Sequence, residues 1–244
     1  MRKTSLKNIF LVFSRDFQEY RKRKVLWIFI LFFIVGSIGC GTGMISAAAR
    51  INDTSARGHD IWLMILGNVL VLYSIIPQII SIPLFSTTPL TYEKANGVVM
   101  SLIATQLQPA EIWLGKSLAV FVTGFVTGII SLVILLVSFE TITAIPVSVI
   151  LCAFVFLPIA MWMLSIITIQ VSMVKSVEKA IAPSYILGFL LLAFFPAGAF
   201  TGAYVPGTVQ FTVICFAIMA LFIIVEIVLA KKITVENIIL ARVK

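Results

Sequence analysis

Charged side chains are scarce in this sequence: they make up 11% of its 244 residues, against 61% for hydrophobic residues. A soluble domain of this length needs a polar exterior, and so few charges cannot provide one. The composition therefore excludes a soluble globular protein. It predicts an integral membrane protein, whose exterior is the lipid bilayer.

Residues that serve most enzyme chemistry are also sparse. The only histidine, His59, lies outside the long apolar runs, which excludes a histidine paired with a serine inside a membrane span, and no HExxH motif is present. The three aspartates are scattered, so a catalytic aspartate pair is excluded. Each of the three cysteines lies in a different apolar run, without the spacing of a disulfide framework or a metal site. We expect neither an enzyme active site nor a bound metal.

Long apolar runs, in contrast, are abundant. About 20 helical residues cross a hydrocarbon core of about 30 Å. Six runs qualify, and none shows the period-two alternation of a membrane β-barrel. They cover residues 25–47, 61–85, 113–138, 146–171, 182–203 and 208–230. The sequence therefore predicts an all-α integral membrane protein with six transmembrane helices, in one transmembrane domain over residues 25–230.

The basic residues predict the orientation of these helices. Of the 18 lysines and arginines, eight precede the first run, four follow the last, and the fourth loop holds two; Lys94 of the second loop and Lys116 just after it are two more. Cytoplasmic segments carry this excess, so both termini, loop 86–112, loop 172–181 and the tail 231–244 are expected in the cytoplasm. The chain is then a multi-pass protein of the cytoplasmic membrane. Its net charge of +8 follows from this topology and from attraction to lipid headgroups, without nucleic acid.

Residues 1–24 precede the first run and contain an amphipathic pattern. Apolar side chains recur at steps of three and four residues, with basic and polar residues between them. The apolar positions are Leu6, Ile9, Phe10, Phe13, Phe17 and Tyr20. This pattern predicts a helix in the inner membrane interface. It is either a general basic anchor or a lever packed against cytoplasmic loops and a partner.

The letters GKS at residues 115–117 match the end of a phosphate-binding loop. A Walker loop needs a glycine five residues before Gly115, and Ala110 stands there. The residues between them include Glu111 and Trp113, which cannot form a glycine-like nest for phosphate. We therefore expect that the chain does not hydrolyse ATP by itself.

The segment around GKS resembles the cytoplasmic loop of the ABC-2 family, the membrane-spanning subunits of ATP-binding-cassette exporters. The matching positions are Glu93, Gly97, Leu102, Thr105, Pro109, Glu111, Ile112, Gly115 and Lys116. Gln106 departs from the pattern, because proline is common there. The N-terminal interface helix, the six spans and the short cytoplasmic tail are also similar to the family in outline.

The resemblance implies that a short coupling helix between the second and third spans docks on an ATP-binding subunit. Gly97 can break the chain, and residues 98–104 can form a compact apolar helix that seats in a groove of another protein. The residues implied in coupling are Tyr92, Glu93, Lys94, Asn96, Gly97, Met100 and Glu111. The alternative is an amphipathic turn that lies on lipid.

Four prolines within the spans predict bends, because each removes a backbone hydrogen bond. They are Pro77, Pro83, Pro158 and Pro196. These bends are either static packing features or hinges. Residues 196–207 combine proline and glycine in a stretch too apolar for an ordinary loop, so we expect a broken or re-entrant helix near the outer face, or else a plain apolar loop.

Glycine pairs with a four-residue spacing, Gly39 with Gly43 and Gly124 with Gly128, indicate close helix packing, either within the chain or in a dimer. Gln78, Gln170 and Glu226 are polar residues inside spans, where such groups are costly and face protein or water. They are candidates for a substrate path or for polar coupling. We expect Glu226 to pair with another segment or to reach the headgroups, since its helical neighbours carry no suitable partner.

These patterns together predict the permease subunit of an exporter. Two ATP-binding subunits and a second permease subunit, identical or homologous, are the implied partners, and ATP and Mg²⁺ are bound by the ATP-binding subunits, with no cofactor in this chain. The alternatives are an ATP-independent secondary carrier and a non-transporting membrane scaffold. A carrier typically has ionisable residues at mid-membrane and an inverted repeat.

Overall fold

The computed structural model describes residues 4–52, 58–96, 98, 107–139, 145–174, 177–201 and 203–231. Throughout these ranges the chain is helical apart from short turns, and none of the described residues is in a β-strand. The predicted all-α fold is confirmed. The predicted residues Gly97 and Met100 lie outside the described ranges.

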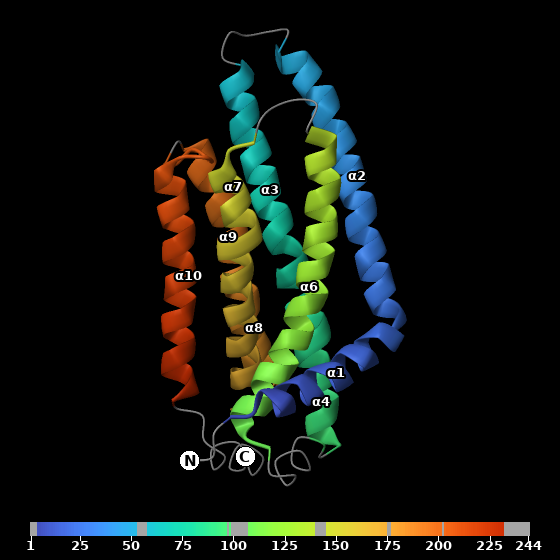
Figure 1. The fold of residues 1–244 in the computed structure, drawn as a ribbon. Coiled ribbons are helices and arrows are strands. Elements are labelled where there is room, and N and C mark those ends of the chain that lie inside the picture. The colour runs from blue at the N-terminus through green and yellow to red at the C-terminus, as the bar shows by residue number, and fades with distance from the viewer. Residues whose placement is uncertain are drawn as a thin grey trace.

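Long, nearly parallel helices form the body of the molecule, and one shorter helix, α1, lies across one end of it (Figure 1). The elements are α1 (Leu6–Lys22), α2 (Lys24–Asn52), α3 (Gly58–Ile82), η1 (Pro83–Thr87), α4 (Thr88–Ala95), α6 (Pro109–Phe139), α7 (Val147–Leu151), η2 (Cys152–Phe156), α8 (Leu157–Val174), α9 (Val177–Phe200) and α10 (Val209–Ala230).

Five of these helical segments are long and apolar enough to cross a membrane, as in a multi-pass membrane protein. They are Lys24–Met44, Met64–Ser86, Pro109–Val137, Val147–Val174 and Val209–Ala230. The fifth predicted span, 182–203, corresponds to α9, in which the apolar stretch Tyr185–Gly198 is shorter.

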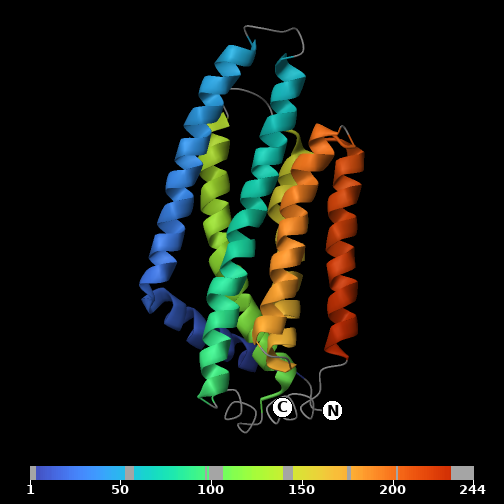
Figure 2. The same cartoon turned by 180° about the vertical axis from the view of Figure 1, so that it is seen from behind.

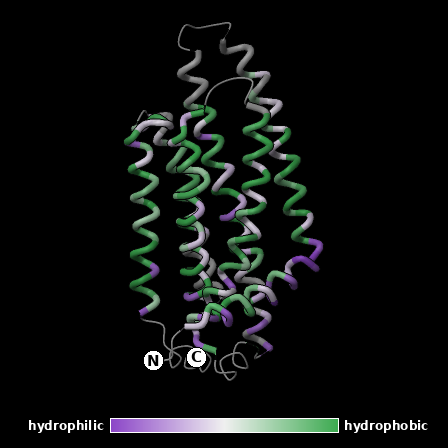
Figure 3. The backbone as a smooth tube through the Cα atoms, viewed as in Figure 1, coloured by the Kyte–Doolittle hydropathy of each residue, from purple (hydrophilic) through white to green (hydrophobic). Residues whose placement is uncertain are grey.

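Hydrophilic residues gather at one end of the bundle, which we call the polar end. It contains α1, α4 and the C-terminal end of α10, whereas the middle of the helices is hydrophobic (Figure 3). Seen from behind, α1 and α4 again lie at the same end (Figure 2). Helix α1, which carries several lysines and arginines, therefore lies at the same end as α4, the described part of the predicted loop 86–112.

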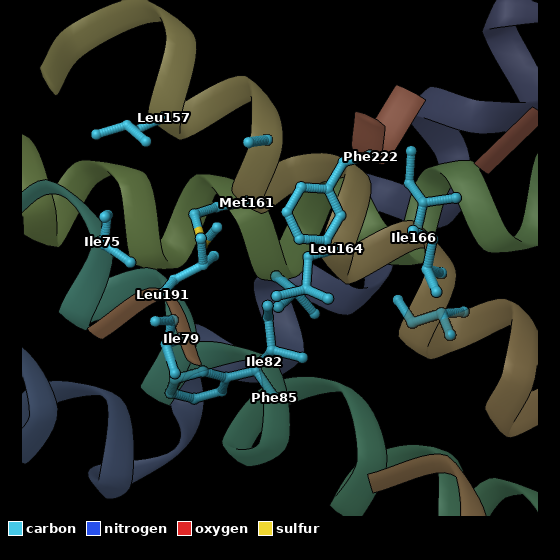
Figure 4. Packing of buried hydrophobic residues seen from close by; sticks show 14 of the residues in the cluster. Ile75, Ile79, Ile82, Phe85, Leu157, Met161, Leu164, Ile166, Leu191 and Phe222 are labelled. Atoms are coloured by element: carbon cyan, nitrogen blue, oxygen red, sulfur yellow. The ribbon is translucent and has the colours of Figure 1, made fainter. Parts of the chain in front are cut away.

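Helix α6 occupies the centre and packs against α1, α2, α3 and α8. The interior combines branched and aromatic side chains from several helices (Figure 4). Those labelled include Ile75, Ile79, Ile82, Met161, Leu164, Leu191 and Phe222. Because lipid chains are as apolar as these residues, close packing rather than removal from water holds the spans together.

One of the predicted glycine positions shows this close packing directly. A Cβ atom on Gly124 would lie 2.4 Å from Ser81 Oγ and 2.9 Å from Gln78 Cα, so α3 and α6 approach each other closely there. The predicted close contact within the chain is confirmed at Gly124. For Gly39 and Gly43, no atom of the described residues lies within 4 Å of such a Cβ, so these glycines make no close contact there.

Two of the four prolines coincide with wide, π-helical turns. Pro83 opens η1, and Pro158 follows η2 by two residues. Such turns accommodate the backbone bond that each proline removes. Pro77 and Pro196, in contrast, lie inside α3 and α9, which continue through them.

The connection from α9 to α10 differs from the predicted break after Pro196, because α9 continues to Phe200. Tyr204 is buried, donates a hydrogen bond to the Phe195 carbonyl and contacts the Phe211 ring. Gly207 has φ +95° and accepts a hydrogen bond from Ser148 Oγ at 3.0 Å. These contacts let α9 extend past Pro196 into a packed turn; the re-entrant form of this segment stays a prediction.

Candidate functional site

The carboxylate of Glu111 caps the N-terminus of α6. Gln108 precedes the helix, Pro109 opens it, and Glu111 in its first turn accepts the Gln108 N–H at 3.0 Å. This is a capping-box arrangement with proline at the first helical position. The same carboxylate accepts the Ser5 N–H at 2.8 Å and the Asn8 Nδ2 amide at 3.1 Å. Glu111 thus joins the N-terminal ends of α6 and α1, and only 2% of it is exposed.

Gly115 is the point at which α1 crosses α6. A Cβ atom there would lie 2.6 Å from Val12 Cβ and 2.8 Å from the Ile9 carbonyl oxygen. A side chain would therefore collide with the α1 backbone as well as with a side chain. The glycine of GKS makes room for a helix rather than for a phosphate.

Lys116 connects three elements through ion pairs. Its Nζ lies 2.9 Å from Asp16 Oδ2 of α1 and 2.7 Å from Glu93 Oε2 of α4. Arg15 extends the group, with Nη2 at 3.1 Å from Glu93 Oε1 and Nε at 3.6 Å from Asp16 Oδ1. We call Arg15, Asp16, Glu93 and Lys116 the four-charge cluster.

The four-charge cluster is mostly withdrawn from solvent. The side chains of Asp16, Lys116 and Glu93 are 3%, 6% and 13% exposed, whereas that of Arg15 is 42% exposed. Each anion faces two cations, so the formal charges cancel. A buried ion pair repays its desolvation only with such geometry, and loss of one partner leaves an uncompensated charge. The relative positions of α1, α4 and α6 therefore depend on all four residues.

Tyr20 attaches the C-terminal end of α1 to η1. Its hydroxyl donates a hydrogen bond to the Phe85 carbonyl of η1 at 2.5 Å, and the two rings are 5.3 Å apart. Burial, together with the negative charges of Asp16 and Glu93, raises the pKa of Tyr20 well above its usual value. The hydroxyl therefore stays protonated and keeps this bond at neutral pH.

Helix α1 consequently packs on the bundle as well as lying across it. Val12, Asp16 and Tyr20 are buried at four-residue spacing, whereas Leu6 and Phe10 are 83% and 64% exposed. The predicted helix is present, and its buried face is centred on Asp16, while Leu6 and Phe10 point away from the bundle. Helix α1 contacts α4 through Arg15 and Glu93, as the lever interpretation requires, but both the anchor and the lever stay predictions.

Comparison with protein families, with curated proteins and with solved structures gave no match. The resemblance to ABC-2 permeases stays a prediction based on the residues named above.

The predicted coupling residues divide between two directions on α4. Glu93 faces α1 and α6 within the four-charge cluster, whereas Tyr92 is 65% exposed. Asn96 is exposed at the end of α4, where its N–H bonds the Tyr92 carbonyl at 2.9 Å. The backbone of Lys94 belongs to α4. Of the coupling residues whose side chains are described, Tyr92 and Asn96 are exposed, while Glu93 and Glu111 contact other parts of the same chain.

The polar residues inside the spans form two separate sets of contacts. Gln78 is buried in α3, and its Nε2 donates to the Ser74 carbonyl at 3.0 Å. Gln170 of α8 is buried and donates to Glu226 Oε1 of α10 at 3.2 Å. The predicted pairing of Glu226 with another segment is confirmed. Within the described residues, no group of three or more His, Cys, Asp or Glu side chains could hold a metal ion.

The sequence interpretation missed Arg15, Asp16 and Tyr20 as members of this junction. One signal was present: Asp16 lies four residues after Val12 and four before Tyr20, so an acid interrupts an otherwise apolar helical face. Lys116, seven residues after Pro109 and followed by a long apolar run, is the complementary signal. Two opposite charges on apolar faces indicate a pair, although spacing alone does not identify it.

Proposed function

We propose that this chain is the membrane-spanning subunit of an ATP-driven exporter, on which a separate ATP-binding subunit acts through the segment between α4 and α6. The observation that supports this function best is the four-charge cluster. It ties α4, which enters that segment, to α6, which leaves it, and ties both to α1. A force applied to the segment would then reach several helices together.

The proposed topology has six spans, with α9 as the fifth in chain order, and both termini in the cytoplasm. The gathering of hydrophilic and basic residues at the polar end supports that orientation. The membrane is the cytoplasmic membrane. The proposed complex holds two ATP-binding subunits, which bind ATP and Mg²⁺, and a second permease subunit that is identical or similar to this one.

The mechanism follows from the stiffness of the junction. Separating the charges of the cluster would expose unpaired ions, so α1, α4 and the start of α6 move as one unit. Closure of the ATP-binding subunits would move this unit and favour one arrangement of the spans. ATP can shift that equilibrium only through contacts that differ between the two arrangements.

Co-purification tests the docking step. The variants Gly97→Trp and Tyr92→Ala change the segment and an exposed residue beside it without touching the four-charge cluster. We expect both to insert normally, to lose the ATP-binding subunit and to lose ATP-dependent transport. If both retain the subunit and full transport, the segment is not the docking site.

ATP consumption distinguishes the proposed exporter from an ATP-independent carrier and from a scaffold. Vesicles that contain the purified complex should hydrolyse ATP faster when a transported substrate is added. Transport by the isolated chain without an ATPase would overturn the proposed function, as would a complex that never consumes ATP.

A further inference from the structure

An apolar groove lies between α9 and α10 on the outside of the bundle. Its volume is about 440 Å³, within the range of about 300–1,000 Å³ that is usual for small-molecule sites. Its lining consists only of apolar side chains, including Leu187, Phe194, Ile218 and Phe222. Leu190 and Leu221 at its edges are each 59% exposed, so the groove opens toward the surrounding lipid.

A carboxylate lies on α10 one helical turn beyond the residues that line this groove. Ile218, Phe222 and Glu226 follow one another at four-residue intervals and so share one face of α10. Glu226 lies one turn beyond Phe222, about 6 Å along the helix axis, toward the polar end. Among the described residues, Glu226 has no salt bridge, and its hydrogen-bond partner is the Gln170 amide.

Gln170 supplies a second, independent sign of a ligand. The residue is 0% exposed, its Nε2 is used by Glu226, and its Oε1 is buried without a hydrogen-bond partner among the described residues. A buried acceptor without a donor is costly. An N–H donor with a positive charge, placed beside Glu226, would satisfy the Gln170 oxygen and the carboxylate together.

We propose that α8, α9 and α10 form a binding site for a single-tailed cationic amphiphile. The tail fills the groove, and the ammonium group lies beside the Glu226 carboxylate, next to its hydrogen bond with Gln170. An anionic amphiphile would place its charge against a carboxylate, and a neutral alcohol would leave that carboxylate unpaired. The polarity of the site also matches the bilayer, since its charged end lies at the polar end of the bundle. Binding is independent of the proposed function; that the bound molecule is also the exported one rests on it.

Photolabelling of the purified chain in phosphatidylcholine nanodiscs tests the site. The probes are dodecylammonium and dodecanol, each with a diazirine in its tail, and labelled peptides are mapped by mass spectrometry. We expect dodecylammonium to label residues of the groove about tenfold more than dodecanol, because a charge-assisted hydrogen bond adds affinity. Glu226→Gln should reduce its labelling to that of dodecanol.

Two matched substitutions separate binding from folding. Ala193 lines the groove and Ala217 of α10 does not, although both are exposed. Ala193→Trp should abolish labelling in the groove by both probes, whereas Ala217→Trp should leave it unchanged. Glu19→Gln, at an exposed acid of α1, should also leave it unchanged.

Three results would overturn the proposal. Equal labelling by the two probes, or unchanged labelling of Glu226→Gln, would show that the carboxylate recognises nothing. Uniform labelling of α2 and α10 would show only contact with bulk lipid. Displacement of dodecylammonium when phosphatidylethanolamine replaces phosphatidylcholine would assign the site to a membrane lipid instead of a single-tailed amphiphile. None of these readouts requires ATP or a partner, so loss of ATP-driven transport leaves the binding result intact.

Discussion

Charges are paired within the chain at the junction of α1, α4 and α6, but not beside the groove between α9 and α10. In the junction, two acids and two bases face one another at 2.7 to 3.6 Å and neutralise each other. Beside the groove, one carboxylate has an amide partner, and a buried carbonyl oxygen has none. The junction is therefore complete within the chain, as a structural connection must be. Beside the groove, the carboxylate and the carbonyl oxygen can still accept hydrogen bonds, as a binding site requires.

The largest effect is expected where the junction loses its central cation. Lys116→Met leaves Asp16 and Glu93 facing each other with only the half-exposed Arg15 nearby, which should cost about 3–5 kcal/mol of unfolding free energy. Unfolding of the purified protein in mixed detergent micelles measures it. Arg21→Met, at an exposed site of α1, is the control and should change stability by less than about 0.5 kcal/mol. Equal stability of the two variants would contradict the structural role of the cluster.

The crossing of α1 over α6 should be the next most sensitive feature. Gly115→Ala forces a methyl group against Val12 and the Ile9 carbonyl and should cost about 1–3 kcal/mol, as overpacking does. Gly39→Ala, in a position with no atom within 4 Å, is the matched control and should be nearly neutral. Protease cleavage in residues 1–24 should become faster in Gly115→Ala only. Cleavage at the same rate in both would show that α1 tolerates the extra carbon.

Tyr20→Phe tests the hydrogen bond to η1. The ring remains, but the Phe85 carbonyl loses its donor, and we expect a loss of about 1–2 kcal/mol at pH 7. Because the folded-state pKa of Tyr20 is raised, its contribution is complete below the usual tyrosine pKa of about 10 and is lost as the pH rises above it. Stability of the wild-type protein should therefore fall more steeply above pH 10 than that of Tyr20→Phe. Parallel curves would mean that the hydroxyl is not buried.

The smallest effect is expected from Glu226→Gln beside the groove, when it is compared with Glu111→Gln in the junction. Glu111→Gln puts an amide NH₂ among three donors and should cost about 1–2 kcal/mol. Glu226→Gln retains an acceptor for Gln170 and should cost less than about 0.5 kcal/mol. Thermal unfolding of the two variants compares the regions directly. A larger loss at Glu226 would reverse the distinction between a structural junction and an open site.

Much of the fold could be predicted from the sequence because it depends on local properties. Each long apolar helix was located by its run length, and the close packing of Gly124 followed from a four-residue spacing. The extension of α9 past Pro196 could not be predicted in this way, since the turn that follows it is held by Tyr204, Ser148 and Gly207 from separate segments. The site was predicted in part. Glu93, Glu111 and Glu226 were identified as important, but not their partners.

The sequence by itself determined that this chain is helical and belongs in a bilayer, because backbone amides in lipid must be satisfied within their own apolar segment. The start of α6 also depends on local contacts, because Gln108, Pro109 and Glu111 act within one turn, although the predicted apolar run began only at residue 113. Only the tertiary structure decided that Lys116 pairs with Asp16, 100 residues away, and that Gly115 receives α1. Ion pairs between distant segments have no periodicity, so only the path of the folded chain selects the partner.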